Sequence, residues 1–228
     1  MKILASDFDN TIYLDDKNVT KKNILAIKKF VSLGNIFCII TGRNYSDLKK
    51  ILIEEDIPYT YLICEDGAKI FNNMDYCLDT ILLNEKEVEK IVSVIKENNW
   101  DYYLDDGYNH TDYYGDCVKI VLNCEDKKEQ EHIIEVIKKI SDVYIYASRT
   151  HVNIIHKSVN KKSALKKLFN IENLDYQFLY VIGDNDNDYE MIKSFNGVIM
   201  KHHHKILDEL KKNEYDTLKD YIEELLKK

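Results

Sequence analysis

Four aspartates in two short segments are spaced as metal ligands often are. Asp7 and Asp9 lie two positions apart in the segment DFDNT, and Asp184 and Asp188 lie in the segment GDNDND; each segment ends an apolar run. Clustered carboxylates repel one another unless a cation or a shared proton intervenes. Because carboxylate oxygens are ligands that Mg²⁺ prefers, the four residues predict a magnesium site.

Two further segments could balance the charge of an anionic substrate at that site. Thr41 offers a hydroxyl group at the end of a third apolar run, and Lys161 offers a cation just before a predicted helix. A phosphate group could approach clustered carboxylates only if the metal, this lysine, the hydroxyl group and backbone N–H donors offset the negative charge. The residue types therefore suit phosphoryl chemistry.

Each segment also has an ordinary structural explanation. Asp7 and Asp9 could be a solvated strand end or a helix cap, and Lys161 could be a surface lysine. Thr41 and Gly42 could form a simple turn. The segment GDNDND could be a calcium-type loop, although it lacks the spaced glutamate of an EF-hand. The order and position of all the segments together favour the catalytic interpretation.

An alternation of strands and helices must position these residues. The apolar runs KILASD, NIFCII and TYLIC are separated by segments with apolar residues at helical spacing, which predicts a parallel sheet with right-handed crossovers. The pattern resumes at Lys161 with a helix, the strand FLYVIG, a helix over Tyr189 to Ile192 and the strand GVIM. The candidate residues follow the carboxyl ends of strands, where open α/β sheets bind their ligands.

A different pattern interrupts this alternation after a break at about residues 72 to 80. A helix is expected to begin in a capping box formed by Asn84 and Glu87, and a second helix lies near Ile133 to Ile140. Strand-like segments accompany them: DYYLDD, CVKIVLNC, VYIYA and HVNIIH. The interruption therefore indicates an inserted α+β unit.

The length of the chain agrees with a core that carries an insertion. Its 228 residues are more than a typical ~150-residue domain needs. We expect an α/β protein in which residues 1–80 and 156–228 form the core and residues 81–155 form the inserted domain.

Composition excludes several other classes of protein. The 32 basic and 40 acidic residues give a net charge of -8 without a dense basic run, so nucleic acid and anionic membranes are not expected partners. No apolar run approaches the ~20 residues of a membrane span. The first residues lack the apolar region of a signal peptide, and the five cysteines contain no CxxC pair, so we expect a cytoplasmic protein with reduced thiols.

Taken together, the segments resemble the motifs of the haloacid dehalogenase (HAD) superfamily, specifically its Cof-type branch of cap-bearing phosphatases (subfamily IIB). DFDNT is similar to the first motif, TGR to the second, Lys161 in VNKKSAL to the third and GDNDND to the fourth. The turn DGA at Asp66 is similar to the family's NGA, with Asp in place of Asn. Lys162 departs from a common glycine, and Lys201 to His203 replace a usual Asn-Ala pair. The resemblance covers essentially the whole chain and implies a Rossmann-like core with a parallel sheet and a C2B-type α+β cap.

The resemblance also implies a two-step phosphoryl transfer. Asp7 would attack phosphorus to give an aspartyl phosphate, and Asp9 would protonate the leaving alcohol and then deprotonate water. Mg²⁺ would be held by Asp7, Asp184 and the backbone carbonyl of Asp9, while Asp188 would orient Lys161 or a water of the metal site. The residues that would bind the phosphoryl oxygens are Thr41, Gly42, Lys161, Asn187 and the backbone of Phe8.

The cap is expected to select the substrate, since it would cover the site. Residues 101 to 116 could hydrogen-bond a sugar, but a polar hairpin with an aromatic inner face is the favoured interpretation. Arg149 and His151 could contact a substrate, although a surface salt bridge explains the arginine equally well. The histidines at 202 to 204 are expected to form an exposed loop rather than a metal site.

Three functions are compatible with these residues. The first is a Mg²⁺-dependent phosphatase of small phosphorylated metabolites, such as sugar phosphates or pyridoxal phosphate. The second is a phosphosugar mutase of the same fold, which would use the same chemistry at Asp7. The third is a non-hydrolysing phosphate-binding regulatory module, which the position of Asp7 on the first strand and the inserted cap both disfavour. The sequence does not specify the physiological substrate, the oligomeric state or the open and closed populations of the cap.

Overall fold

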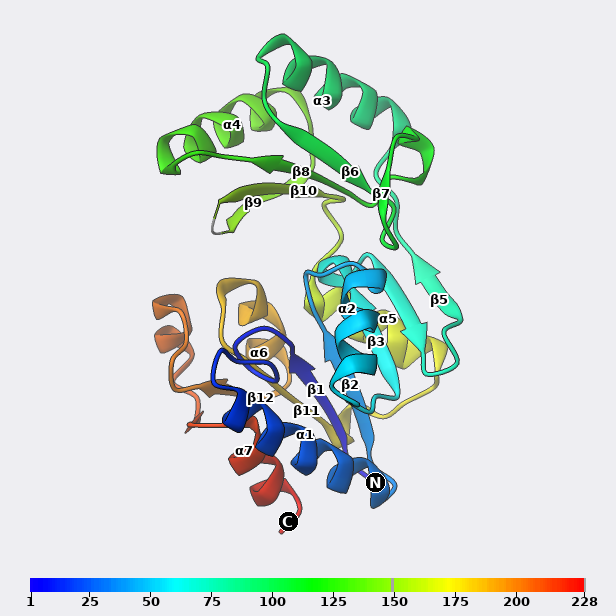
Figure 1. Ribbon diagram of the computed structural model, residues 1–228, viewed down its shortest axis with the longest axis vertical. Coiled ribbons are helices and arrows are strands. Elements are labelled where there is room, and N and C mark those ends of the chain that lie inside the picture. Colours follow the sequence, from blue (N-terminus) through cyan, green and yellow to red (C-terminus); the bar gives the residue numbers. More distant parts are fainter. Residues whose placement is uncertain (149, 228) are drawn as a thin grey trace.

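Two sheets, one above the other, organise the computed structural model, which describes residues 1–148 and 150–227 (Figure 1). The eight-stranded sheet takes its strands from both ends of the chain, and the five-stranded sheet takes them from the middle. All strands of the smaller sheet fall within residues 81–155, the range expected for the inserted domain. The α/β class is confirmed, while the domain boundaries stay a prediction.

The larger sheet is mostly parallel, as the sequence predicts. Its strand order is β13-β12-β11-β1-β2-β3-β4-β5, and the pairs from β13 to β3 are all parallel. The bounds of its strands are β1 Ile3–Asp7, β2 Ile36–Ile40, β3 Tyr61–Cys64, β4 Lys69–Asn72, β5 Cys77–Thr80, β11 Leu179–Gly183, β12 Asn196–Met200 and β13 Glu214–Tyr215.

The last two strands of this sheet depart from the expected pattern. β4 runs antiparallel to both β3 and β5, so a hairpin occupies the region where the sequence suggested only a break. The Asn72 side chain closes its turn by accepting hydrogen bonds from the N–H groups of Met74 and Tyr76. β5 has the sequence CLDT, which is too short to reveal itself by hydrophobic alternation.

Helices cover both faces of the larger sheet because successive strand residues point to opposite sides. Leu4 of β1 packs into a core with residues of α1, α2 and α7, whereas Ile3 and Ala5 pack into a second core with α5 and α6. The bounds of these helices are α1 Lys17–Ser32, α2 Tyr45–Glu54, α5 Lys161–Ile171, α6 Tyr189–Ser194 and α7 Leu218–Leu225. None of the helices in the described ranges is both long and apolar enough to span a membrane.

The smaller sheet forms a cap with one helical face and one open face. Its antiparallel strand order is β7-β6-β8-β10-β9, with bounds β6 Tyr102–Asp105, β7 His110–Thr111, β8 Lys119–Asn123, β9 Tyr144–Ser148 and β10 His151–Ile155. Ile120 and Leu122 of β8 pack with α3 (Glu85–Glu97) and α4 (Lys127–Ile140). The alternate residues Lys119 and Val121 point to the other face and line a cavity above the larger sheet.

The start of α3 differs in one detail from the expectation. Asn84 is the N-cap, and its side chain accepts a hydrogen bond from the N–H of Lys86. Glu87 does not return the bond to complete a capping box. Its carboxylate instead accepts a hydrogen bond from the Ser141 hydroxyl group at 3.0 Å, which ties α3 to the end of α4.

Candidate active site

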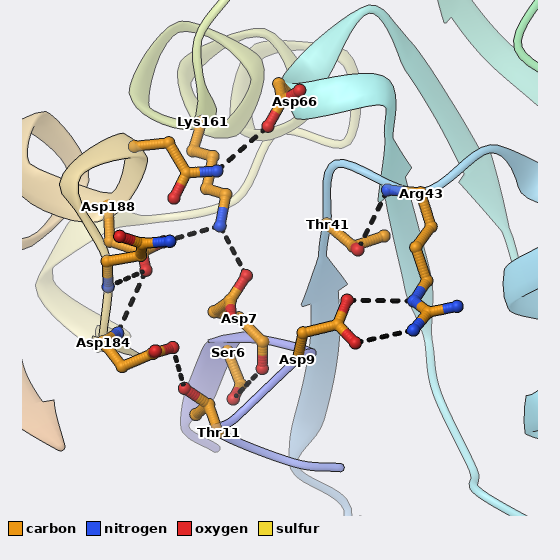
Figure 2. A network of polar contacts seen from close by, with 12 residues as sticks. Ser6, Asp7, Asp9, Thr11, Thr41, Arg43, Asp66, Lys161, Asp184 and Asp188 are labelled. Carbon is orange, nitrogen blue, oxygen red and sulfur yellow. Dashed lines mark hydrogen bonds and ion pairs between the residues drawn. The ribbon is translucent and has the colours of Figure 1, made fainter. Parts of the chain in front are cut away.

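The first and the last sequence motif meet because their strands are neighbours. Asp7 is the last residue of β1, and Asp184 directly follows β11, which pairs with β1 in parallel. Asp7, Asp184 and Asp188 are buried, and each offers a carboxylate oxygen within 4.8 Å of those of the other two. The structure therefore brings together three of the four aspartates predicted from the sequence (Figure 2).

Lys161 connects this carboxylate cluster to a helix start. It is the first residue of α5, after the N-cap Asn160, and its Nζ atom lies 2.5 Å from Asp7 Oδ1 and 2.7 Å from Asp188 Oδ1. Burial alone would lower the pKa of this fully buried amine, but Asp188 and Asp7 outweigh the cost and raise the pKa above its usual value. Lys161 is therefore a permanent cation at the end of β1.

Asp188 is held by more bonds than either of its neighbours in the cluster. Besides Lys161, its carboxylate accepts hydrogen bonds from the backbone N–H groups of Asp184 and Asn185, at 3.0 and 3.1 Å. It sits so close to Gly183 that a Cβ atom there would lie 2.3 Å from the Asp188 Cγ atom. The glycine is thus required by this close approach, and Asp188 shapes the loop rather than facing the cavity.

The other two aspartates of the cluster, Asp7 and Asp184, line the cavity and could bind a cation. Burial, and then the neighbouring charges of Asp188 and Asp184, raise the pKa of Asp7 well above its usual value although Lys161 lowers it. Burial and Asp188 likewise raise the pKa of Asp184, which also accepts a 2.9 Å hydrogen bond from the Thr11 hydroxyl group. A set of buried oxygen ligands that repel one another in this way fits a divalent metal ion.

Asp9 lies outside the cluster and is paired with an arginine. Its carboxylate accepts hydrogen bonds from Arg43 Nε at 2.9 Å and from Arg43 Nη2 at 2.7 Å, so the pair is bidentate. The nearby Thr41 is buried, and its hydroxyl group accepts a hydrogen bond from the Arg43 N–H at 3.1 Å. No role was predicted for Arg43 from the sequence, although it is the third residue of the TGR motif at a strand end, which was the available signal.

A cavity of about 640 Å³ lies between these residues and the open face of the cap. Among the predicted residues, the core contributes Asp7, Asp9, Thr41, Gly42, Asp184 and Asn187 to its wall, and the cap contributes His151. Phe8 is fully buried, and Arg149 lies outside the described residues.

The Tyr- and Asp-rich segment and the three histidines, also candidates from the sequence, contribute few residues to the cavity. From the segment 101 to 116 only Tyr103 and Asp105 line the cavity. Among the three histidines, His204 lines the cavity, while His202 Nε2 lies 2.7 Å from the Asn10 carbonyl oxygen and His203 pairs with Asp208.

A buried group of polar residues between cap and core was not predicted from the sequence. Lys119 of β8 contacts Glu65 and Asp66 in the 3₁₀ turn Glu65–Gly67, and Tyr146 of β9 donates a hydrogen bond to Asp66. Asn187, predicted to bind the phosphoryl group, donates a 3.0 Å hydrogen bond to Asp66 as well. A lysine and a tyrosine inside two apolar strand segments carried no signal that could have linked them to residue 66.

This arrangement of strand-end carboxylates, a helix-start lysine and an inserted cap matches a known family. The model of the haloacid dehalogenase-like hydrolases matches residues 4–113 and 103–220. The chain belongs to this family. Its identification as a HAD-like, Cof-type phosphatase is thereby confirmed.

Relatives and solved structures of HAD-like proteins cover nearly the whole chain. A 5-amino-6-(5-phospho-D-ribitylamino)uracil phosphatase of Bacillus subtilis is 23% identical over 220 residues, which are 92% of this chain and 87% of that protein. A phosphoglycolate phosphatase of Methanobrevibacter smithii is 24% identical over 200 residues, which are 83% of this chain and 81% of that protein. The crystal structure of a haloacid dehalogenase-like hydrolase from Bacteroides thetaiotaomicron superposes with a TM-score of 0.84 at 15% identity, covering 98% of this chain and 99% of that one. This HAD-like chain is therefore an enzyme, and its relatives place it among the phosphoric monoester hydrolases.

Proposed function

We propose that this enzyme is a Mg²⁺-dependent phosphatase that hydrolyses small phosphorylated metabolites through an aspartyl phosphate. The observation that carries the proposal is the buried group of Asp7, Asp184, Asp188 and Lys161 at the carboxyl edge of a parallel sheet, directly beneath a cavity. In such a group, a carboxylate nucleophile, a fixed cation and oxygen ligands for a metal would surround one point.

Asp7 is the proposed nucleophile, because it lines the cavity while Lys161 holds one of its oxygens. Asp7, Asp184 and the backbone carbonyl of Asp9 would hold the metal ion. Bound there, Mg²⁺ would supply positive charge that draws the phosphate dianion toward the carboxylates and polarises it. Lys161, Thr41, the backbone of Phe8 and Gly42, and Asn187 would bind the phosphoryl oxygens.

Asp9 is the proposed acid and base. In the first step it would give a proton to the leaving alcohol, and in the second it would take a proton from the attacking water. The bidentate pair with Arg43 fixes the direction of the Asp9 carboxylate at the edge of the cavity. To give a proton to the leaving oxygen, Asp9 must first carry one, so one of these two hydrogen bonds must be given up when the phosphate ester binds.

The cavity supports a leaving group with several hydroxyl groups or a heteroaromatic ring. Its cap side offers the hydroxyl groups of Tyr103 and Ser148, the amide of Asn153 and the imidazole of His151. A volume of about 640 Å³ is suited to a metabolite of this size. The substrate named for the Bacillus subtilis relative, a phosphoribitylamino-uracil, combines both features.

The proposal is tested by measuring phosphate release from a panel of sugar phosphates and pyridoxal phosphate. We expect EDTA to abolish release and Mg²⁺ to restore it, because Asp7, Asp184 and a phosphate dianion repel one another without a cation. Asp7→Asn should be inactive with unchanged folding. Undiminished release after removal of the metal, or isomerised substrate in place of free phosphate, would contradict the proposal; the second result would indicate a mutase.

A further inference from the structure

One cation from the cap enters the core beside the proposed phosphate-binding residues. Lys119 of β8 is 5% exposed in its side chain, and its Nζ atom lies 2.8 Å from the Gly42 carbonyl oxygen. The same atom lies 2.6 Å from Glu65 Oε2 and 3.2 Å from Asp66 Oδ2. Lys119 thus contacts the turn that contains Gly42 and both acidic residues of the 3₁₀ turn.

Asp66 connects Lys119 to the rest of the proposed phosphate site. Its Oδ1 atom accepts the 3.0 Å hydrogen bond from the Asn187 side chain, and its backbone N–H donates to the Thr41 carbonyl oxygen at 2.9 Å. Tyr146 of the cap donates to Oδ2. The Asp66 carboxylate also packs against Gly42: a Cβ atom at position 42 would lie 3.1 Å from Asp66 Oδ1. Asp66 therefore contacts both segments that are proposed to hold the phosphoryl oxygens.

The charge of Asp66 must be balanced where it lies. The residue is 3% exposed, and burial by itself would raise the pKa of its carboxyl group. Lys119, the hydrogen bond from Tyr146 and the more distant Lys161 outweigh burial and lower the pKa, so Asp66 is ionised. Without Lys119, the buried Asp66 carboxylate would lose the cation that contacts it, which is costly.

We propose that Lys119 is a positioning residue for phosphoryl transfer. By neutralising Asp66 from the cap, it allows Asp66 to keep its hydrogen bond to Asn187 and its contact with Gly42. The phosphate-binding segments of the core are thus assembled only beneath a seated cap. The inference rests on the proposed function, since it assigns Lys119 a part in that reaction; it names no contact between Lys119 and the substrate.

A charge-rescue series tests this role. Lys119→Met should lower kcat/KM about 10- to 100-fold, the usual effect of losing a residue that orients a ligand-binding group. The loss should be equal for p-nitrophenyl phosphate and for a sugar phosphate, because Asn187 and Gly42 serve the phosphoryl group of both. Asp66→Asn in the Lys119→Met background should restore most of the activity, since a neutral amide oxygen still accepts the bond from Asn187 and no longer needs a cation.

Lys69→Met is the matched control. Lys69 is a buried core lysine at the same boundary, where its Nζ atom lies 3.7 Å from the ring centroid of Tyr108 in the cap, and it neither lines the cavity nor contacts Asp66. Its variant should keep kcat/KM for p-nitrophenyl phosphate within about twofold while disturbing the boundary. Equal losses in the two lysine variants, a loss confined to one substrate, or a double variant no better than Lys119→Met would each overturn the proposal.

Two further measurements keep the test informative. Should Lys119→Met fail to fold, Tyr146→Phe removes a hydrogen bond to Asp66 without a change of charge, and the same rescue by Asp66→Asn is expected. Binding of inorganic phosphate, measured by calorimetry, should weaken in Lys119→Met and recover in the double variant. If wild-type protein hydrolyses no phosphomonoester, the proposed function fails. The phosphate titration then decides the inference alone, and unchanged affinity across the series would overturn it.

Discussion

At the scale of single residues, one buried cation is shared by two carboxylates. Lys119 contacts Glu65 and Asp66, and Asp66 also receives hydrogen bonds from Tyr146 and Asn187. Glu65 is buried beside them. Burial therefore raises the pKa of Glu65 to about 7, although Lys119 opposes the shift. Glu65 is the member of the cluster that takes up a proton near neutral pH.

This protonation predicts a pH-dependent stability. Because the pKa of Glu65 rises from an ordinary 4.5 to about 7 on folding, its protonated form favours the folded state. The contribution is complete below pH 4.5 and is lost as the pH rises through about 7. Urea unfolding from about pH 4.5 to about pH 8 should thus show wild type losing stability relative to Glu65→Gln, by about 1.4 kcal/mol per unit of pKa shift. A difference between the two proteins that does not vary with pH would contradict the assignment.

Residues of the motifs could be predicted from the sequence, but their partners could not. The topology of a parallel sheet alone brings these motif residues to one edge. Asp7 ends a strand, Asp184 follows one, and Lys161 begins a helix. Lys119 and Asp66 are 53 positions apart, on a cap strand and a core turn, and no periodicity relates them. Their contact depends on how the cap docks, which is decided by packing between two sheets.

At the scale of elements, the strand ends of the core carry the proposed catalytic residues, and the open face of the cap lines the cavity opposite them. β10 begins at His151, which lines the cavity. Parallel strands and their helices were evident from hydrophobic spacing, whereas the hairpin of β4 and β5 was not, because its second strand has only four residues without regular alternation. Short edge strands pair through their backbones and leave little trace in the pattern of side chains.

If cap residues contact the leaving group, a substitution in β10 should change the substrate preference. His151→Ala should change kcat/KM unequally across the panel of phosphoesters, by up to about tenfold, because a lost contact affects only those leaving groups that make it. His156→Ala is the control, since His156 follows the same strand, bonds to Ser158 and does not line the cavity. A uniform loss over all substrates in His151→Ala would instead assign this residue to the phosphoryl site.

At the scale of the whole molecule, the two sheets lie one above the other (Figure 1), and residues of both line the cavity. The core holds every residue proposed to touch the transferred group, and the cap supplies the cation beside Asp66 and several residues of the cavity wall. The cap and the core are also joined directly, since Asn44 at the start of α2 donates a 2.9 Å hydrogen bond to Asp105 of β6. We propose that the phosphoryl group is transferred covalently to Asp7 beneath this cap.

The most direct measurement of that claim is to trap the phosphorylated enzyme in an Asp9→Asn variant. p-Nitrophenolate leaves without a proton, so the variant should still transfer the phosphoryl group to Asp7, but it lacks the base that activates water for the second step. Acid quenching followed by peptide mass spectrometry should then find phosphate on the peptide that contains Asp7, and none in the Asp7→Asn/Asp9→Asn double variant. Near-wild-type release of phosphate by Asp9→Asn with no labelled peptide would contradict a covalent intermediate at Asp7.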